Sequence, residues 1–72
     1  MSTETKVRDL LCAYCTVPEQ AGATLEIDSL SLIQLVEELE VAFDIRVLPS
    51  EASPANFGTV ERLVAFVEGK GR

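Results

Sequence analysis

The chain has 72 residues and a formal net charge of −6. A chain of this length is expected to form one domain, residues 1–72, and to bury only about 60% of its unfolded surface, which leaves little room for both a core and an enclosed active site. From residue 9 to residue 44 there are eight carboxylates and no Lys or Arg. This acidic middle disfavours binding to nucleic acid or anionic membrane and favours partners with a basic patch, although an ordinary solvated surface can have the same composition.

The apolar runs are too short to insert into a membrane, and the first residues, MSTETKV, lack the basic start and apolar stretch of a signal peptide. The expected location is therefore the cytoplasm. Cys12 and Cys15 form a C-x-x-C pair, but the chain has no histidine and no third cysteine to complete a zinc site. A thioredoxin-like pair would need a βαβ context that this chain does not offer. The favoured interpretation is two small apolar residues one helical turn apart.

The first predicted element is an amphipathic helix from about Thr3 to Cys15, capped by Ser2 or Thr3. Its apolar residues recur at helical spacing and are Val7, Leu10, Leu11 and Tyr14. Proline, glycine and small polar residues then interrupt the pattern, which predicts a loop. Leu25 or Ile27 is expected to anchor this loop in the core.

A second helix is predicted from about Ser29 to Phe43. Asp28 is its expected cap, because a carboxylate there can accept a hydrogen bond from an early backbone N–H and suits the positive end of the helix dipole. The "IRV" that follows residue 44 is expected to be extended or loop. Prolines then permit only a short helical turn, near Pro54 to Phe57.

The last predicted helix runs from about Val60 to Glu68 and stops at Gly69 and Gly71. The residues that it should bury are Val60, Leu63, Val64 and Val67. Together these elements predict an all-α fold, a small four-helix bundle with a short third helix.

The second helix carries aliphatic residues outside its core face. At about 100° per residue, the core arc holds Leu32, Leu35, Val36, Leu39 and Phe43. Leu30, Ile33 and Val41 lie outside this arc, where they alternate with Gln34, Glu37 and Glu40, and both glutamates are expected to be exposed. Single surface aliphatics are common. Here two of the three lie within a turn of Ser29, which indicates a docking surface unless loop residues cover it.

Ser29 has two possible roles. Serine is common at helix starts because its hydroxyl satisfies free backbone N–H groups, so Asp28-Ser29 can be a cap and nothing more. Nucleophilic catalysis by Ser29 is not expected, because the chain has no histidine and no lysine near it in sequence to act as a base. Chemistry at Ser29 would need activation by another protein, so the chain is not expected to be an enzyme.

The stretch LEIDSLSLIQLVEELEVAFDIRV resembles the core of acyl and peptidyl carrier proteins, which carry 4′-phosphopantetheine on the serine of a D-S-L motif at the start of the second helix. VRDLL and FGTVERLVAFVE extend the resemblance to the first and last helices. The part from Gln34 onward is more similar to free-standing aminoacyl carriers such as the D-alanyl carrier proteins. Two features depart from the family: the first loop is short, and Glu26 stands where the pattern has glycine.

The resemblance implies a bundle of acyl-carrier type and a mechanism. A phosphopantetheinyl transferase with Mg²⁺ would move phosphopantetheine from coenzyme A to Ser29, and the thiol would hold an acyl or aminoacyl group as a thioester. The implied partners are that transferase, a loading enzyme, and a downstream transferase or synthase of a biosynthetic pathway, with polyketide and nonribosomal peptide synthesis as examples. The carrier is expected to be a monomer and to make weak, fast contacts. The docking residues would be Asp28, Leu30, Ile33, Glu37, Glu40 and Val41.

Two alternatives remain open. One is a small helical interaction module without a prosthetic group, in which Asp28-Ser29 is only a cap. The other is an enzyme or redox protein that uses Cys12 and Cys15.

Overall fold

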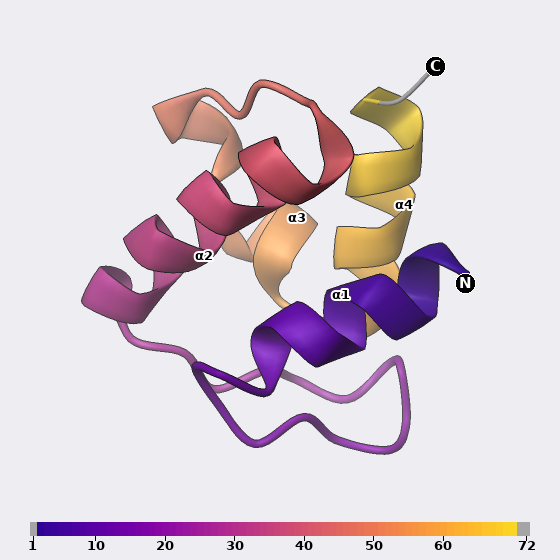
Figure 1. Ribbon diagram of the computed structural model, residues 1–72. Helices are drawn as coiled ribbons and strands as arrows, with labels where there is room; N and C mark the ends of the chain where they lie inside the picture. The colour runs from indigo at the N-terminus through magenta and orange to yellow at the C-terminus, as the bar shows by residue number, and fades with distance from the viewer. Residues whose placement is uncertain (1, 71–72) are drawn as a thin grey trace.

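The computed structural model describes residues 2–70 and is all-α over this range. Its elements are α1 (Thr3–Leu11), α2 (Ser29–Phe43), the 3₁₀ helix η1 (Pro49–Glu51), α3 (Pro54–Phe57) and α4 (Val60–Lys70). α4 packs against α1 and α3, and α1 also packs against α2 (Figure 1). The predicted small bundle of four α-helices with a short third helix is confirmed. The bounds of α2 and α3 match the prediction, and η1 was not predicted.

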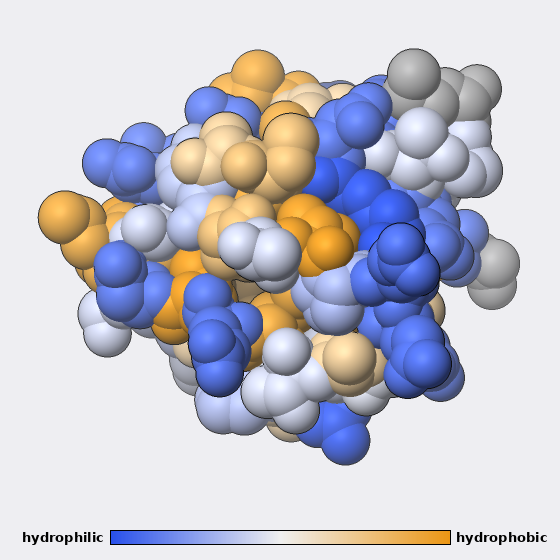
Figure 2. Space-filling model, turned by 90° about the horizontal axis from the view of Figure 1, so that it is seen from below, coloured by the Kyte–Doolittle hydropathy of each residue, from blue (hydrophilic) through white to orange (hydrophobic). Residues whose placement is uncertain are grey.

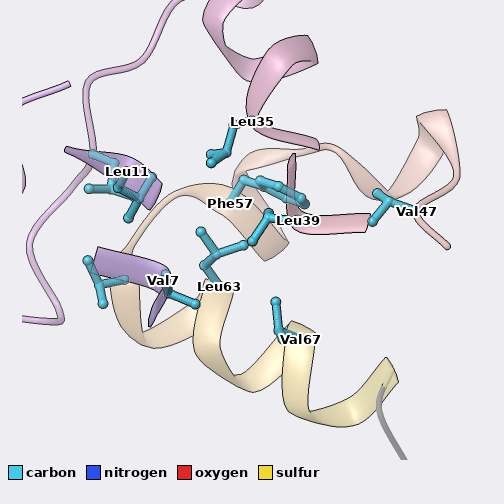
Figure 3. Packing of buried hydrophobic residues seen from close by; sticks show 10 residues of the cluster. Val7, Leu11, Leu35, Leu39, Val47, Phe57, Leu63 and Val67 are labelled. Atoms are coloured by element: carbon cyan, nitrogen blue, oxygen red, sulfur yellow. The ribbon is translucent and has the colours of Figure 1, made fainter. Parts of the chain in front are cut away.

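Every α-helix contributes to one apolar core. The buried residues are Val7, Leu11, Leu25, Leu35, Leu39, Val47, Phe57, Val60, Leu63 and Val67. In Figure 3 the side chains of α1, α2, α3 and α4 converge on this cluster. The buried stripes are narrower than predicted: of the core arc of α2 only Leu35 and Leu39 are fully buried. A domain this small cannot cover a wide apolar arc on every helix, so the flanking residues are partly exposed.

The predicted end of the first helix was wrong, because α1 ends at Leu11 and not near Cys15. The Arg8 guanidinium donates hydrogen bonds to the carbonyls of Pro18, at 2.6 Å, and Glu19, at 2.9 Å. These contacts hold the following loop back against the last turn of α1. Residues 12–15 therefore form a turn in place of another helical turn.

The loop before α2 is attached to the start of α4. Leu25 is buried as predicted, with 7% of its surface exposed, and its N–H donates to the Gly58 carbonyl at 2.8 Å. Thr24 and Thr59 form an isolated antiparallel bridge next to this bond. These contacts hold the short loop against the segment that leads into α4.

The predicted stop of the last helix was also wrong, because α4 continues through Gly69 to Lys70; Gly71 lies outside the described residues. The Lys70 ammonium donates to the Glu51 carboxylate at 2.7 Å and lies 5.6 Å from the centre of the Phe66 ring. Glu51 also accepts the N–H of Leu48 at 2.9 Å. These contacts keep the last turn of α4 helical and connect it to η1.

Candidate functional site

The start of α2 is capped by Asp28. Its backbone is extended, with φ −79° and ψ 168°, and its carboxylate accepts the N–H of Ser31 at 2.7 Å, so the predicted cap is confirmed. This hydrogen bond, helped by the Ser31 side chain, lowers the pKa of Asp28 below its ordinary value and keeps the carboxylate ionised. Ser29 is the first residue of α2 and is exposed. Because Asp28 provides the cap, the Ser29 hydroxyl is not needed for that purpose.

An apolar hollow opens beside Ser29, between α2 and the segment that leads into η1. It has a volume of about 380 Å³ and is lined by Ser29, Leu32, Ile33, Val36, Glu37, Val47, Leu48, Pro49 and Ala52. Ser29 therefore lies where the solvent-exposed helix start meets an apolar surface. The contribution of residues 47–52 was missed by the sequence analysis. The apolar pair Leu48-Pro49 in a predicted loop was the only signal for it.

The three aliphatic residues predicted to lie outside the core arc of α2 are confirmed as exposed. The exposed fractions are 69% for Leu30, 59% for Ile33 and 85% for Val41, so no loop covers them. Leu48, which the sequence analysis did not single out, is 51% exposed. Figure 2 shows apolar surface broken up by hydrophilic residues on its left side, the side on which α2 begins in Figure 1.

The two glutamates predicted to share this face differ in their surroundings. Glu37 is exposed, as predicted, and borders the hollow. The expectation that Glu40 is exposed was wrong: it is half-buried, and its Oε2 accepts the N–H of Val47 at 2.8 Å. The chain folds back against α2 after residue 44, and this backbone donor needs an acceptor once water is partly excluded. Glu40 supplies that acceptor.

The two cysteines differ in their surroundings. Both thiols are free, and Cys12 is exposed with its Sγ–H donating to the Asp9 carbonyl at 2.9 Å. Burial, and secondly the neighbouring Cys12, raise the pKa of Cys15. A raised pKa reduces the thiolate fraction and with it the reactivity. Within residues 2–70 no cluster of three or more His, Cys, Asp or Glu side chains is arranged to hold a metal ion.

None of the helices within residues 2–70 has the length and apolar character needed to span a bilayer.

The fold and the helix start together define a small helical domain whose second helix begins with an exposed serine beside an apolar hollow. The family model described as the phosphopantetheine attachment site matches residues 5–67, and the chain belongs to this family. It is thus a carrier protein with a phosphopantetheine arm. The family carries 4′-phosphopantetheine covalently on a serine, and its members are carriers and not catalysts. No significant match was found among curated proteins or among solved structures.

Proposed function

We propose that this chain is an acyl or aminoacyl carrier that holds its cargo as a thioester on a 4′-phosphopantetheine arm at Ser29. The observation that carries the proposal is the division of roles at the start of α2. Asp28 accepts the backbone hydrogen bond of the cap, which leaves the neighbouring Ser29 hydroxyl exposed and available for modification.

The helix start suits a phosphodiester on Ser29. The first backbone N–H groups of α2 have no partner within the helix, and the positive end of the dipole stabilises an anion there by about 0.3–1 kcal/mol. The first turn of α2 contains no acidic residue, so only the Asp28 cap carries a competing charge there. That ionised carboxylate opposes a second anion nearby, which favours a cation from the transferase or its Mg²⁺ at this point.

This chain supplies the nucleophile of the attachment step and no base. The Ser29 oxygen would form a bond to the phosphorus that bears the pantetheine of coenzyme A. The adenosine bisphosphate leaves with the electrons of the broken P–O bond, and the hydroxyl proton passes to a base of the transferase. The chain has no histidine that could take this proton. When bound, the arm supplies the thiol that forms the thioester.

The surface around Ser29 suits both cargo and partners. The hollow beside it is lined mostly by aliphatic side chains, so an apolar part of the cargo can lie there out of water. Asp28, Leu30, Ile33, Glu37 and Val41 form a docking stripe for the transferase, a loading enzyme and a downstream transferase or synthase. Glu40 is left out of this stripe because its carboxylate is bound to the Val47 backbone.

The test is the intact mass of the protein after incubation with coenzyme A, Mg²⁺ and a broad-specificity phosphopantetheinyl transferase. The parent should gain one phosphopantetheine, which peptide mapping should place on Ser29, and Ser29→Ala should gain none while remaining folded. Ser31→Ala is the matched control and should be modified as the parent is. A Ser29→Ala protein with the full mass increment would refute the proposal and direct the search to Ser31 or Ser50. An unmodified parent would favour the interaction module without a prosthetic group.

A further inference from the structure

A second open groove lies between α1 and α2. It has a volume of about 700 Å³ and is lined by Leu10, Tyr14, Gln34, Glu37, Glu38, Val41 and Ala42. Glu37 borders both this groove and the hollow beside Ser29, so the two depressions flank one ridge of α2. Val41 of the docking stripe forms part of the groove wall, which makes the groove continuous with the stripe.

The groove combines an apolar lining with negative charge. Leu10 of α1 and Tyr14 of the turn that follows α1 line one side, and Val41, the most exposed large aliphatic residue of α2, lines the other. Glu37 and Glu38 are exposed carboxylates in the same lining. Partial burial of the phenol, and secondly the Glu38 carboxylate, raise the pKa of Tyr14.

One positive charge lies on α1, outside the groove lining. Lys6 lies on α1 one turn before Leu10, and its ammonium is 4.9 Å from the centre of the Phe43 ring at the end of α2. The carboxylates lie nearer the middle of α2. A partner that fits this arrangement places its cationic groups over the middle of α2 and keeps them away from Lys6.

We propose that the groove between α1 and α2 docks a basic amphipathic helix of a partner enzyme. The helix would insert an aliphatic side chain between Leu10 and Val41 and place Lys or Arg against Glu37 and Glu38. A second copy of this chain does not fit, because its net charge of −6 would bring carboxylates together. The identification of the partner as an enzyme that acts on the carrier rests on the proposed function. A partner held in this groove leaves the hollow beside Ser29 open.

The probe is a synthetic helical peptide with leucines one turn apart and lysines between them. Its binding to the ¹⁵N-labelled full chain is followed by NMR. Saturable shifts should centre on Leu10, Tyr14, Glu38 and Val41. A peptide with Glu in place of Lys, or Ala in place of Leu, should bind at least about tenfold more weakly, because it lacks one of the two complementary features.

A matched pair of variants tests the location. Ala42 lines the groove and Ala65 lies on α4, and both are exposed helical alanines, so Ala42→Arg and Ala65→Arg make the same chemical change at two places. Ala42→Arg should weaken peptide binding by about tenfold or more, and Ala65→Arg by less than about twofold. Equal effects of the two variants, shifts centred on Ser29 and Leu48, or no saturable binding would each overturn the proposal.

The mass assay separates this inference from the proposed function. A parent that binds the peptide in the groove but gains no phosphopantetheine would support the groove and refute the carrier role. A parent that is modified on Ser29 but shows no groove binding would overturn the groove and leave the carrier role standing.

Discussion

Reversal of the charge at Glu40 should destabilise the protein, whereas the same reversal at Glu37 should not. The Glu40 carboxylate accepts the backbone N–H of Val47 at 2.8 Å, and the Val47 side chain is buried with 8% of its surface exposed. Lysine has no acceptor, so Glu40→Lys leaves this N–H without a protein partner and adds a like donor beside it. Glu37 is exposed and has no comparable role in the fold.

The size of the effect follows from this one contact. A hydrogen bond to a charged group contributes about 1.5–3 kcal/mol to stability. Water at the half-buried site replaces part of this bond, so we expect Glu40→Lys to lower the free energy of unfolding by about 1–2 kcal/mol. For 72 residues the entropy of unfolding is about 150 cal/mol/K. The melting temperature of Glu40→Lys should therefore fall by about 7–13 °C.

Thermal unfolding followed by far-UV circular dichroism measures this difference. Glu40→Gln keeps an amide oxygen as acceptor and should lose less than half as much stability as Glu40→Lys. Glu37→Lys should melt within about 3 °C of the parent, since surface substitutions rarely change the free energy of unfolding by more than about 0.5 kcal/mol. It should instead slow phosphopantetheine transfer, most strongly at low salt. Equal melting temperatures for Glu40→Lys and Glu37→Lys would show that the contact with Val47 contributes nothing.

Three further predictions concern other parts of the fold. Asp44→Gly should raise the free energy of unfolding by about 0.5–1 kcal/mol, measured by urea unfolding. Asp44 caps the end of α2 with φ 53°, which glycine adopts more easily, and its charge lies at the negative end of the helix dipole. An unchanged urea midpoint would exclude backbone strain at Asp44. Glu51→Gln should destabilise the protein at neutral pH, because Lys70 lowers the pKa of Glu51. A carboxyl whose pKa is lowered by folding stabilises the protein fully at pH values above its ordinary pKa, about 4.3. This stabilisation is lost as the pH falls through the lowered pKa, so the melting temperatures of the parent and Glu51→Gln should converge in acid. The Cys12→Ser, Cys15→Ala double variant should fold and accept phosphopantetheine; loss of modification with a normal helical spectrum would contradict this.

Sequence alone predicted the helices wherever local signals determine their ends. Asp28 supplies a cap for α2, and the periodic pattern stops at Phe43, so both bounds of α2 were predicted correctly. The ends of α1 and α4 depend on contacts distant in sequence. Arg8 binds Pro18, ten residues away, and Lys70 binds Glu51, nineteen residues away. Neither pairing is visible in helical periodicity.

The candidate site was predictable to the same extent. Ser29, its cap and the exposed aliphatics are features of one helix, so spacing alone separates them from the core. The hollow and the role of Glu40 arise where the segment from Asp44 to Ala52 folds back against α2. The path of that segment depends on the left-handed conformation of Asp44 and on the contact between Glu51 and Lys70. A helical wheel contains none of this information.

Several features of α2 do not serve stability. An acidic first turn and a basic last turn would complement the helix dipole, and α2 has neither. Its first turn, Ser29-Leu30-Ser31, carries no acidic side chain, so the Asp28 cap supplies the negative charge at the positive end. Leu30 and Ile33 are exposed where polar side chains would be more soluble. Departures from the rules of stable helices are expected at functional sites, and the exposed Leu30 and Ile33 lie within about one turn of the serine that we propose as the attachment site.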